Sequence, residues 1–297
     1  MGQAAGIIGL GIMGSAFSRN MMKNGLRVVG YDIDDGKLDG LAREGLTRAG
    51  SPADVARQAD VVITSLPSPA AFHAVMTGEN GLASSGRAGL VVADTCTLTV
   101  EDKQKAFDAL APHDVILLDC PVSGTGAQAA NADLAILGSG DEAAFRKAKP
   151  ILESFSRNAH YVGAFGNGSK TKYVANLLVA IHNVSAAEAL VLGQKAGLDP
   201  ATLLAVLQDG AGNSRMLEMR GPMMVANDYD SKVSATMITQ DKDMGIINAF
   251  IDGVGAPAPL FKATLDLYKA ALSQGLENSD TASVCAVLEN MAGMERD

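Results

Sequence analysis

The sequence is poor in cysteine and has no cluster of basic residues. Its three cysteines, Cys96, Cys120 and Cys285, are odd in number and far apart, and no CxxC spacing occurs. This pattern argues against a disulfide framework and against a zinc site, and it is typical of a reducing compartment. The formal net charge is −9. A nucleic-acid partner is therefore not expected, because phosphate binding needs clustered positive charge.

The sequence also lacks signals for export and for membrane insertion. The first apolar run, residues 4–10, leads directly into a glycine motif, with no basic segment before it and no cleavage site after it. No apolar run has the length of a membrane span. We therefore expect a cytoplasmic protein with no membrane partner and no bound metal.

The first half of the chain alternates short apolar runs with polar, alanine-rich segments. The apolar runs predict strands at residues 5–10, 27–33, 61–66, 90–94 and 115–120, with weaker candidates at 134–137 and 161–162. The segments 13–24, 52–59, 69–76 and 100–110 predict helices. Nearly continuous apolar runs are typical of parallel strands that are buried on both faces. The alternation predicts an α/β fold, a Rossmann-type doubly wound parallel sheet.

The pattern changes near residue 166, where the strand signals stop. A helical pattern without a breaker predicts one long helix over residues 169–195, and further helices are predicted at 200–207, 238–251, 260–274 and the C-terminus. With 297 residues the chain is long enough for two domains. We predict a dinucleotide-binding domain over residues 1–165 and an all-helical substrate and dimerisation domain over 166–297, linked by the long helix.

A glycine motif follows the first predicted strand and opens the first helix. Its residues are Gly9, Leu10, Gly11, Ile12, Met13 and Gly14, in a GxGxxG pattern. In this setting the second glycine lets the backbone approach a pyrophosphate, and the helix N-terminus supplies N–H groups and partial positive charge. The alternative is a tight turn with no ligand. The context favours a dinucleotide cofactor.

Asp32 stands at the end of the second predicted strand, where an acid can bind the ribose hydroxyls. A 2′-phosphate beside this carboxylate would meet like-charge repulsion, and NADP enzymes usually place an arginine just beyond this point. Here Ile33, Asp34 and Asp35 follow instead. We therefore predict NAD as the cofactor, and we interpret Asp34 and Asp35 as helix N-capping residues.

Several motifs, taken in order along nearly the whole chain, resemble those of the β-hydroxyacid dehydrogenase family, which includes 3-hydroxyisobutyrate dehydrogenase and tartronate semialdehyde reductase. They are the GLGIMG segment at 9–14, Leu66-Pro67, Asp94-Thr95-Cys96-Thr97, Asp119-Cys120-Pro121-Val122-Ser123-Gly124, Gly166-x-Gly168-x-x-x-Lys172 with Asn176, and Lys242-Asp243. The resemblance implies cofactor contacts for Leu66, Pro67, Thr97 and Lys242, and substrate contacts for Ser123, Gly124 and Thr125. Three positions depart from the family pattern, namely Cys96 for serine, Thr125 for glycine and Ala175 for asparagine.

The chemistry of alcohol oxidation needs a base for the hydroxyl proton beside the hydride acceptor. Lys172 is the candidate, because the helix N-terminus and burial against a cofactor both disfavour its charged form. Asn176 follows four residues later on the same helix face and can bind the substrate oxygen or fix the lysine. Lys170, by contrast, is interpreted as an ordinary surface lysine. The alternative for Lys172 is the same.

The substrate is expected to be a small 3-hydroxy acid or its semialdehyde or keto form. Backbone N–H groups at Ser123 and Gly124 follow a strand end and suit a carboxylate, although a purely structural turn is the alternative. Arg215 stands where family members often have a bulky aromatic residue, and the chain has no tryptophan. Arg215 either binds a second anionic or strongly polar group of the substrate or pairs with Glu218 on its own helix.

Two other functions share this architecture. An imine reductase usually lacks the lysine, and a non-catalytic cofactor-sensing module would be expected to lose Lys172 or Asn176. The four histidines are scattered and are interpreted as structural or surface residues, and the methionines at 216, 219, 223 and 224 as packing residues. We also expect a homodimer or homotetramer, because the helical half has many apolar helices and family members associate through this region.

Overall fold

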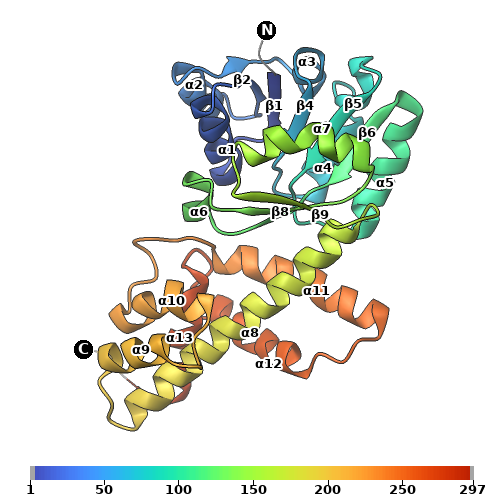
Figure 1. The fold of residues 1–297 in the computed structure, drawn as a ribbon. Coiled ribbons are helices and arrows are strands. Elements are labelled where there is room, and N and C mark those ends of the chain that lie inside the picture. Colours follow the sequence, from blue (N-terminus) through green and yellow to red (C-terminus); the bar gives the residue numbers. More distant parts are fainter. Residues whose placement is uncertain (1–3, 295–297) are drawn as a thin grey trace. The chain divides into compact units, whose positions relative to one another are not determined.

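The computed structural model describes residues 4–294, and the chain divides into two compact units, residues 1–172 and 173–297. The first unit contains a six-stranded parallel sheet with strand order β3-β2-β1-β4-β5-β6 (Figure 1). Its strands are β1 (Ala4–Ile8), β2 (Arg27–Tyr31), β3 (Thr47–Arg48), β4 (Val61–Thr64), β5 (Leu90–Asp94) and β6 (Val115–Asp119). The strand order turns at β1 and β4, so the loops at the carboxyl ends of these strands form the usual ligand crevice of such sheets.

Helices cover both faces of this sheet because alternate strand residues belong to two separate cores. Ile7 and Ile63 pack in one core together with Phe17 of α1 and Phe145 of α7. Ile8 and its neighbours pack in the other core, with residues of α3, α4 and α5. The helices of this unit are α1 (Ile12–Lys23), α2 (Asp35–Arg43), α3 (Pro52–Gln58), α4 (Pro69–Thr77), α5 (Val100–Leu110), α6 (Gly126–Ala130) and α7 (Glu142–Glu153), with short 3₁₀ turns at Leu82–Ser85 and Ala111–His113. The doubly wound arrangement predicted from the sequence is confirmed.

Helix starts follow local sequence signals. The hydroxyl oxygens of Ser51, Ser68 and Thr99 accept hydrogen bonds from the backbone N–H groups of the first turns of α3, α4 and α5. Proline opens both α3 and α4, where its missing N–H costs nothing. Asp34 likewise accepts from the N–H groups of Gly36 and Lys37 at the start of α2, so its interpretation as an N-cap is correct.

A second, three-stranded sheet lies in the same unit, with order β7-β8-β9. Its strands are β7 (Val122–Ser123), β8 (Ala135–Gly138) and β9 (Asn158–Tyr161), and β7 and β8 are antiparallel. The weak strand candidate at 134–137 therefore belongs to this sheet, and the one at 161–162 is shifted, since β9 ends at Tyr161. An antiparallel bridge between Asp119 and Ser139 connects β6 to the end of β8.

The second unit is helical. Helix α8 (Asn167–Lys195) begins in the first unit and continues into the second, followed by α9 (Pro200–Asp209), α10 (Arg215–Ala226), α11 (Met237–Val254), α12 (Pro259–Ser273), a 3₁₀ turn (Thr281–Ser283) and α13 (Val284–Met291). The long helix thus starts two residues before its predicted start. The first compact unit ends inside this helix, at residue 172.

Helix α8 also corrects one expectation. By length and composition alone it could cross a membrane, because one 18-residue window has a mean hydropathy of 1.5 and few charges. The core helix of a soluble protein passes the same test, and 39% of this window is buried within the structure. This window does not stand out as one apolar run in the sequence, because polar residues interrupt it.

Candidate active site

The glycine loop between β1 and α1 is shaped by two glycines that the chain itself requires. Gly9 has φ +92°, and a Cβ there would lie 2.2 Å from the carbonyl oxygen of Ser65. A Cβ on Gly14 would lie 1.8 Å from the carbonyl oxygen of Gly9. Because both obstacles are backbone atoms, neither can move aside. These two positions fix the turn and bring the start of α1 against the end of β1.

Gly11 is different, and this difference bears on the cofactor. Its φ is −67°, which any residue adopts, and a Cβ there would meet no atom of the described chain within 4 Å. The fold therefore gives no steric reason for glycine at the N-terminus of α1. A nucleotide pyrophosphate that approaches the backbone closely supplies that reason, since helix N–H groups and the helix dipole attract it. The residues of this loop fit a dinucleotide.

Asp32 connects the end of β2 to the glycine loop. Its Oδ2 accepts a hydrogen bond from the N–H of Leu10 at 2.6 Å, and its Oδ1 accepts from the N–H of Asp34 at 2.8 Å. The side chain is half-buried, as a ribose-binding acid needs to be. Backbone hydrogen bonds from Lys37 and Gly36 hold the pKa of the neighbouring Asp34 below its usual value.

An arginine that no local sequence motif indicates lies close to Asp32. Arg48 of β3 pairs with Asp35 at 2.8 Å and also with Asp39. It comes from the strand next to β2 in the sheet, so the sequence distance from Asp32 conceals it. Two carboxylates already balance its charge. Because of these two ion pairs, Arg48 differs from an arginine whose guanidinium is open to a 2′-phosphate.

The loops after β4 and β5 are joined by a sulfur contact. The N–H of Leu66 donates to Sγ of Cys96 at 3.1 Å, and the hydroxyl of Thr95 donates to the carbonyl oxygen of Thr64 at 2.7 Å. Burial raises the pKa of the Cys96 thiol, and the charge of Asp94 raises it further. Cys96 therefore acts as a hydrogen-bond acceptor at the family's serine position. Next to it, Pro67 is exposed and Thr97 is half-buried at the carboxyl edge of the sheet.

The predicted substrate loop lies beside the cofactor loop. Ser123 ends β7 and is half-buried, and Gly124 has φ +140°, where a Cβ would meet the side chain of Leu134 at 2.4 Å. A Cβ on Gly126 would lie 2.8 Å from Cγ2 of Ile12, so the side chain of Ile12 touches the start of α6. The structure thus brings the two motifs together although more than a hundred residues separate them in sequence.

Thr125 has a local role. Its N–H donates to Oε1 of Gln128 at 3.0 Å, which is half of a capping interaction at the start of α6. The hydroxyl of Thr125, which glycine lacks, also donates to Oε1 of Gln128 at 3.4 Å, so the departure from glycine adds a contact of its own. Met13 is half-buried beside the core of the first unit.

The start of α8 packs closely against the strand ends of the first unit. A Cβ on Gly168 would lie 2.3 Å from the carbonyl oxygen of Leu137 and 2.5 Å from that of Asp119. The N–H of Ser169 donates to Oδ2 of Asp119 at 2.7 Å. Lys172 follows in this tightly held turn and is only 8% exposed, whereas Lys170 is exposed. The two lysines thus have the different environments that the sequence predicts.

Asn176 lies one helical turn after Lys172, in the second unit. Its Nδ2 donates to Oδ2 of Asp243 on α11 at 3.1 Å, and Lys242 pairs with the other carboxylate oxygen of Asp243 at 3.2 Å. A carboxylate only accepts hydrogen bonds, so this contact fixes which end of the Asn176 amide faces Asp243. Asp243 was not among the predicted site residues. Its position next to Lys242 in the sequence could have indicated Asp243 as a site residue.

Arg215 is exposed, and its guanidinium lies 3.1 Å from Glu218 on α10. This pair is the alternative that the sequence left open for Arg215. The nearby Arg220 is instead buried, and it donates to Oδ1 of Asp280 at 3.0 Å. Nothing in these contacts directs Arg215 to a substrate.

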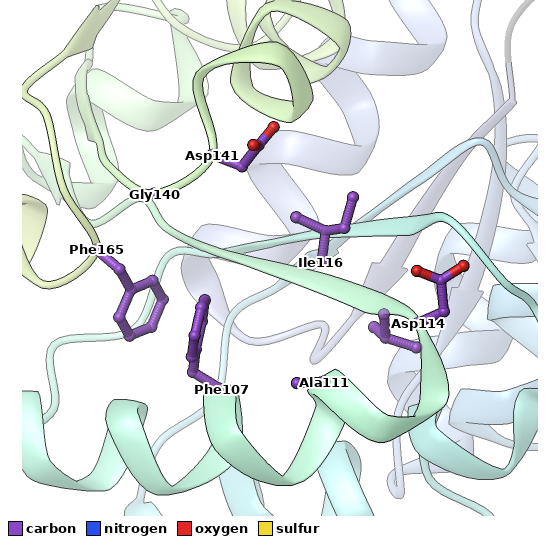
Figure 2. A pocket seen from close by; sticks show the side chains of 8 residues that line it. Phe107, Ala111, Asp114, Ile116, Gly140, Asp141 and Phe165 are labelled. Atoms are coloured by element: carbon purple, nitrogen blue, oxygen red, sulfur yellow. The ribbon is translucent and has the colours of Figure 1, made fainter.

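A shallow depression on the first unit lies away from these loops. It is lined by Phe107, Ala111, Asp114, Ile116 and Phe165, among others, beside the amino end of the edge strand β6 (Figure 2). The rings of Phe107 and Phe165 lie 4.5 Å apart between centroids. Since ligands of such sheets bind at the carboxyl ends of the strands, this depression is not part of the site.

The comparisons with known proteins agree with this geometry. A family model described as the NAD binding domain of 6-phosphogluconate dehydrogenase matches residues 4–163. A second, described as NAD-binding of NADP-dependent 3-hydroxyisobutyrate dehydrogenase, matches residues 166–288. The chain belongs to the NAD(P)-dependent β-hydroxyacid dehydrogenase family. As a β-hydroxyacid dehydrogenase it is an oxidoreductase that uses a nicotinamide cofactor.

Similar relatives cover nearly the whole chain. The chain is 30% identical to 2-(hydroxymethyl)glutarate dehydrogenase of Eubacterium barkeri, over 97% of this chain and 96% of that protein. It is 32% identical to L-threonate dehydrogenase of Cupriavidus necator, over 97% and 96%. The structure of 3-hydroxyisobutyrate dehydrogenase from Mycobacterium tuberculosis, with L-serine, matches with a TM-score of 0.86 and 30% identity, over 97% of this chain and 99% of that chain.

Proposed function

We propose that this β-hydroxyacid dehydrogenase transfers hydride between NAD and a small 3-hydroxy acid, or its semialdehyde or keto form, with Lys172 as general acid and base. The observation that carries the proposal is the buried Lys172, held in the first turns of α8 against the strand ends that lead to the substrate loop. A buried lysine beside a reactive group is suited to exchange protons. Bound NAD supplies the hydride acceptor.

Ser123, Gly124, Lys172 and Asn176 are proposed to bind the substrate and to transfer its proton. Ser123 and Gly124 present a hydroxyl and backbone N–H groups that suit the substrate carboxylate. During oxidation the neutral amine of Lys172 takes the proton of the substrate hydroxyl, and in reduction its ammonium returns a proton to the carbonyl oxygen. Asn176 is proposed to hydrogen-bond the same substrate oxygen, with its amide fixed by Asp243. The lysine thus carries the proton while the asparagine orients the oxygen.

A panel of hydroxy acids tests the proposal directly. The panel contains 3-hydroxyisobutyrate, L-threonate and 2-(hydroxymethyl)glutarate, with succinic semialdehyde and glyoxylate in the reducing direction, because proteins similar to this chain are named for these compounds. NADH formation or consumption with at least one member supports the proposal. A cyclic imine added to the panel separates the two other functions, since an imine reductase would consume NADH only with that compound and a non-catalytic module would bind NAD without any turnover. The buried Lys172 favours neither of them.

We expect NAD to be preferred over NADP by at least about 10-fold in kcat/KM, a difference of about 1.4 kcal/mol. Asp32 follows β2, a position where a carboxylate repels a 2′-phosphate, and the charge of Arg48 is already balanced by Asp35 and Asp39. Steady-state kinetics with the two cofactors at one substrate concentration measure the ratio. Asp32→Asn should lower the ratio of kcat/KM with NAD to kcat/KM with NADP, because it removes the repulsion between the carboxylate and the 2′-phosphate. Equal values in the unsubstituted protein would contradict the prediction.

We also propose that the protein is a homodimer or a larger homo-oligomer. Val174, Leu178 and Leu192 lie along one face of α8, because their spacing matches the helical repeat, and they are 58%, 48% and 72% exposed. Large apolar side chains exposed on one face usually mark an interface. Light scattering at micromolar concentration should give at least twice the mass of one chain, and Leu192→Glu should lower it. A single-chain mass at all concentrations would refute this.

A further inference from the structure

Three ionisable side chains that the proposed reaction does not use are completely buried in the first unit. Lys103 of α5 places its Nζ 2.7 Å from Oδ1 of Asp119 and 2.9 Å from Oδ2 of Asp94, and the exposed fraction of all three side chains is 0%. Charges are rarely buried to this degree, since each loses its hydration. A cluster of this kind at the carboxyl edge of the sheet therefore calls for a role.

The sheet itself brings the two acids together. Asp94 and Asp119 end the neighbouring parallel strands β5 and β6, and they are register partners. Partners in adjacent strands lie about 4.8 Å apart and point to the same face. Two buried carboxylates at this separation cannot both stay ionised without a cation between them. Lys103 is that cation. Burial lowers its pKa, but the two carboxylates outweigh this effect and hold the pKa above its usual value.

Both oxygens of the Asp119 carboxylate accept hydrogen bonds from Ser169 at the beginning of α8. Its Oδ1 accepts from Lys103 and from the hydroxyl of Ser169 at 2.8 Å. Its Oδ2 accepts from the N–H of Ser169 at 2.7 Å. The hydroxyl of Ser139, which donates to the carbonyl oxygen of Asp119 at 3.1 Å, also faces Oδ2 at 3.3 Å. Lys103, Ser139 and Ser169 thus surround both carboxylate oxygens, and the side chain is completely buried, so no face of it is open to a substrate. Asp119 therefore acts on the helix and not on the ligand.

Ser139 extends the same attachment. Its hydroxyl oxygen accepts from the N–H of Gly168 at 2.9 Å, so two consecutive N–H groups of the first turn of α8 are fixed to the β6 and β8 strand ends. The negative charge of Asp119 also interacts favourably with the positive end of this helix. The net negative charge of the cluster, one ammonium against two carboxylates, is thereby partly offset.

Asp94 attaches the same ammonium to the opposite loop. Its Oδ1 accepts from the hydroxyl of Thr64 at 2.6 Å and faces the N–H of Cys96 at 3.4 Å. The segment 95–97 contains Thr97, one of the predicted cofactor contacts. One buried lysine thus links the loop on the cofactor side to the turn that leads to Lys172.

We propose that Asp119, paired with Lys103, is a positioning residue that fixes the first turn of α8 and through it Lys172. This inference rests on the proposed function, because it assigns to Lys172 the acid–base role. Both carboxylate oxygens are needed, because an amide at position 119 would present an NH₂ group, which only donates, to the donors that now face one of these oxygens. A hydride transfer needs the base within a fraction of an ångström of its productive place. A loosened turn therefore lowers turnover while the cofactor loop stays intact.

The first test is Asp119→Asn, with Asp108→Asn on the exposed face of α5 as matched control. Asp119→Asn leaves Lys103 paired with Asp94, a neutral pair, so the variant is expected to fold. Hydrogen exchange at the backbone of residues 168–173 should become at least about 10-fold faster. The kcat should fall at least about 10-fold, the KM for the hydroxy acid should change less than about 3-fold and NADH affinity should stay unchanged. Asp108→Asn should match the unsubstituted protein in hydrogen exchange, kcat, KM and NADH affinity.

The second test addresses Lys103. Lys103→Met leaves two buried carboxylates side by side, so one must take up a proton, and exchange at 168–173 should again become faster. Adding Asp94→Asn leaves Asp119 as the sole anion and should restore both the protection of α8 and most of kcat. Lys105→Met, on the exposed face of α5, is the control.

The outcomes separate the proposals. Unchanged exchange in folded Asp119→Asn overturns the inference, and so does faster exchange with unchanged kcat, since the attachment would then be structural only. Failure of Asp94→Asn to restore Lys103→Met also overturns it. A protein that oxidises no hydroxy acid refutes the proposed function, whereas the exchange measurement still reads the attachment of α8.

Discussion

Replacing Lys172 by alanine is expected to lower kcat by about 100- to 10,000-fold, the range that general acid–base groups contribute. The substitution removes the only group proposed to carry the substrate proton, and the side chain it removes is buried. NADH affinity should stay within about 3-fold, because the glycine loop and Asp32 lie on other elements. Stopped turnover together with intact cofactor binding, measured by kinetics and fluorescence titration, is the expected result.

A second lysine provides the control for this measurement. Lys170 precedes Lys172 by two residues on the same helix, but its side chain is exposed. Lys170→Ala should therefore leave kcat and KM unchanged, while any general effect of shortening a lysine in α8 would appear in both variants. Turnover near the unsubstituted level in Lys172→Ala would remove the lysine from the mechanism and with it the proposed proton transfer.

The sequence predicted the large sheet well because each of its long strands is buried on both faces. Such strands consist almost entirely of apolar residues, so β1, β2, β4, β5 and β6 are visible as uninterrupted runs. Short elements carry no such signal. Strands β3 and β7 have two residues each, and α6 has five. Helices α2, α7 and α10 contain glycine or proline, which argue against a helix when only local sequence is considered.

The candidate site residues could be proposed from the sequence where a local motif contains them. The glycine loop, Ser123–Gly124 and the two lysines of α8 follow from spacing and neighbouring elements. Lys103, Arg48 and the role of Asp119 could not be found in this way, because their partners come from other strands and helices. A lysine in an amphipathic helix is usually on the surface, and only the register of β5 and β6 shows that Lys103 is buried between two acids. Arg215 shows the opposite case, since a motif position pointed to a ligand while the structure pairs it with Glu218.

Two glycines of the cofactor loop are expected to differ in what an alanine at their position disrupts, which is the fold at Gly14 and cofactor binding at Gly11. Gly14→Ala should destabilise the protein by about 3 kcal/mol or more, since its Cβ would lie 1.8 Å from the backbone oxygen of Gly9 and neither backbone can yield without opening the turn. Gly11→Ala should cost only about 0.5–1 kcal/mol, the difference between glycine and alanine at a helix N-cap. Denaturant unfolding without cofactor measures both free energies.

The affinity for NAD, by contrast, should respond strongly to Gly11→Ala, although this substitution costs little stability. The Cβ of Gly11→Ala enters space that no described atom of the chain occupies, directly at the N-terminus of α1. If a pyrophosphate lies there, the added methyl group displaces it from the helix N–H groups, and NAD binding should weaken at least about 10-fold, equal to about 1.4 kcal/mol. Gly245→Ala on α11 is the control, because a Cβ there also meets no atom and the position is exposed. If Gly11→Ala binds NAD as tightly as the unsubstituted protein, the pyrophosphate does not approach this residue, and the loop does not hold the dinucleotide in the manner proposed.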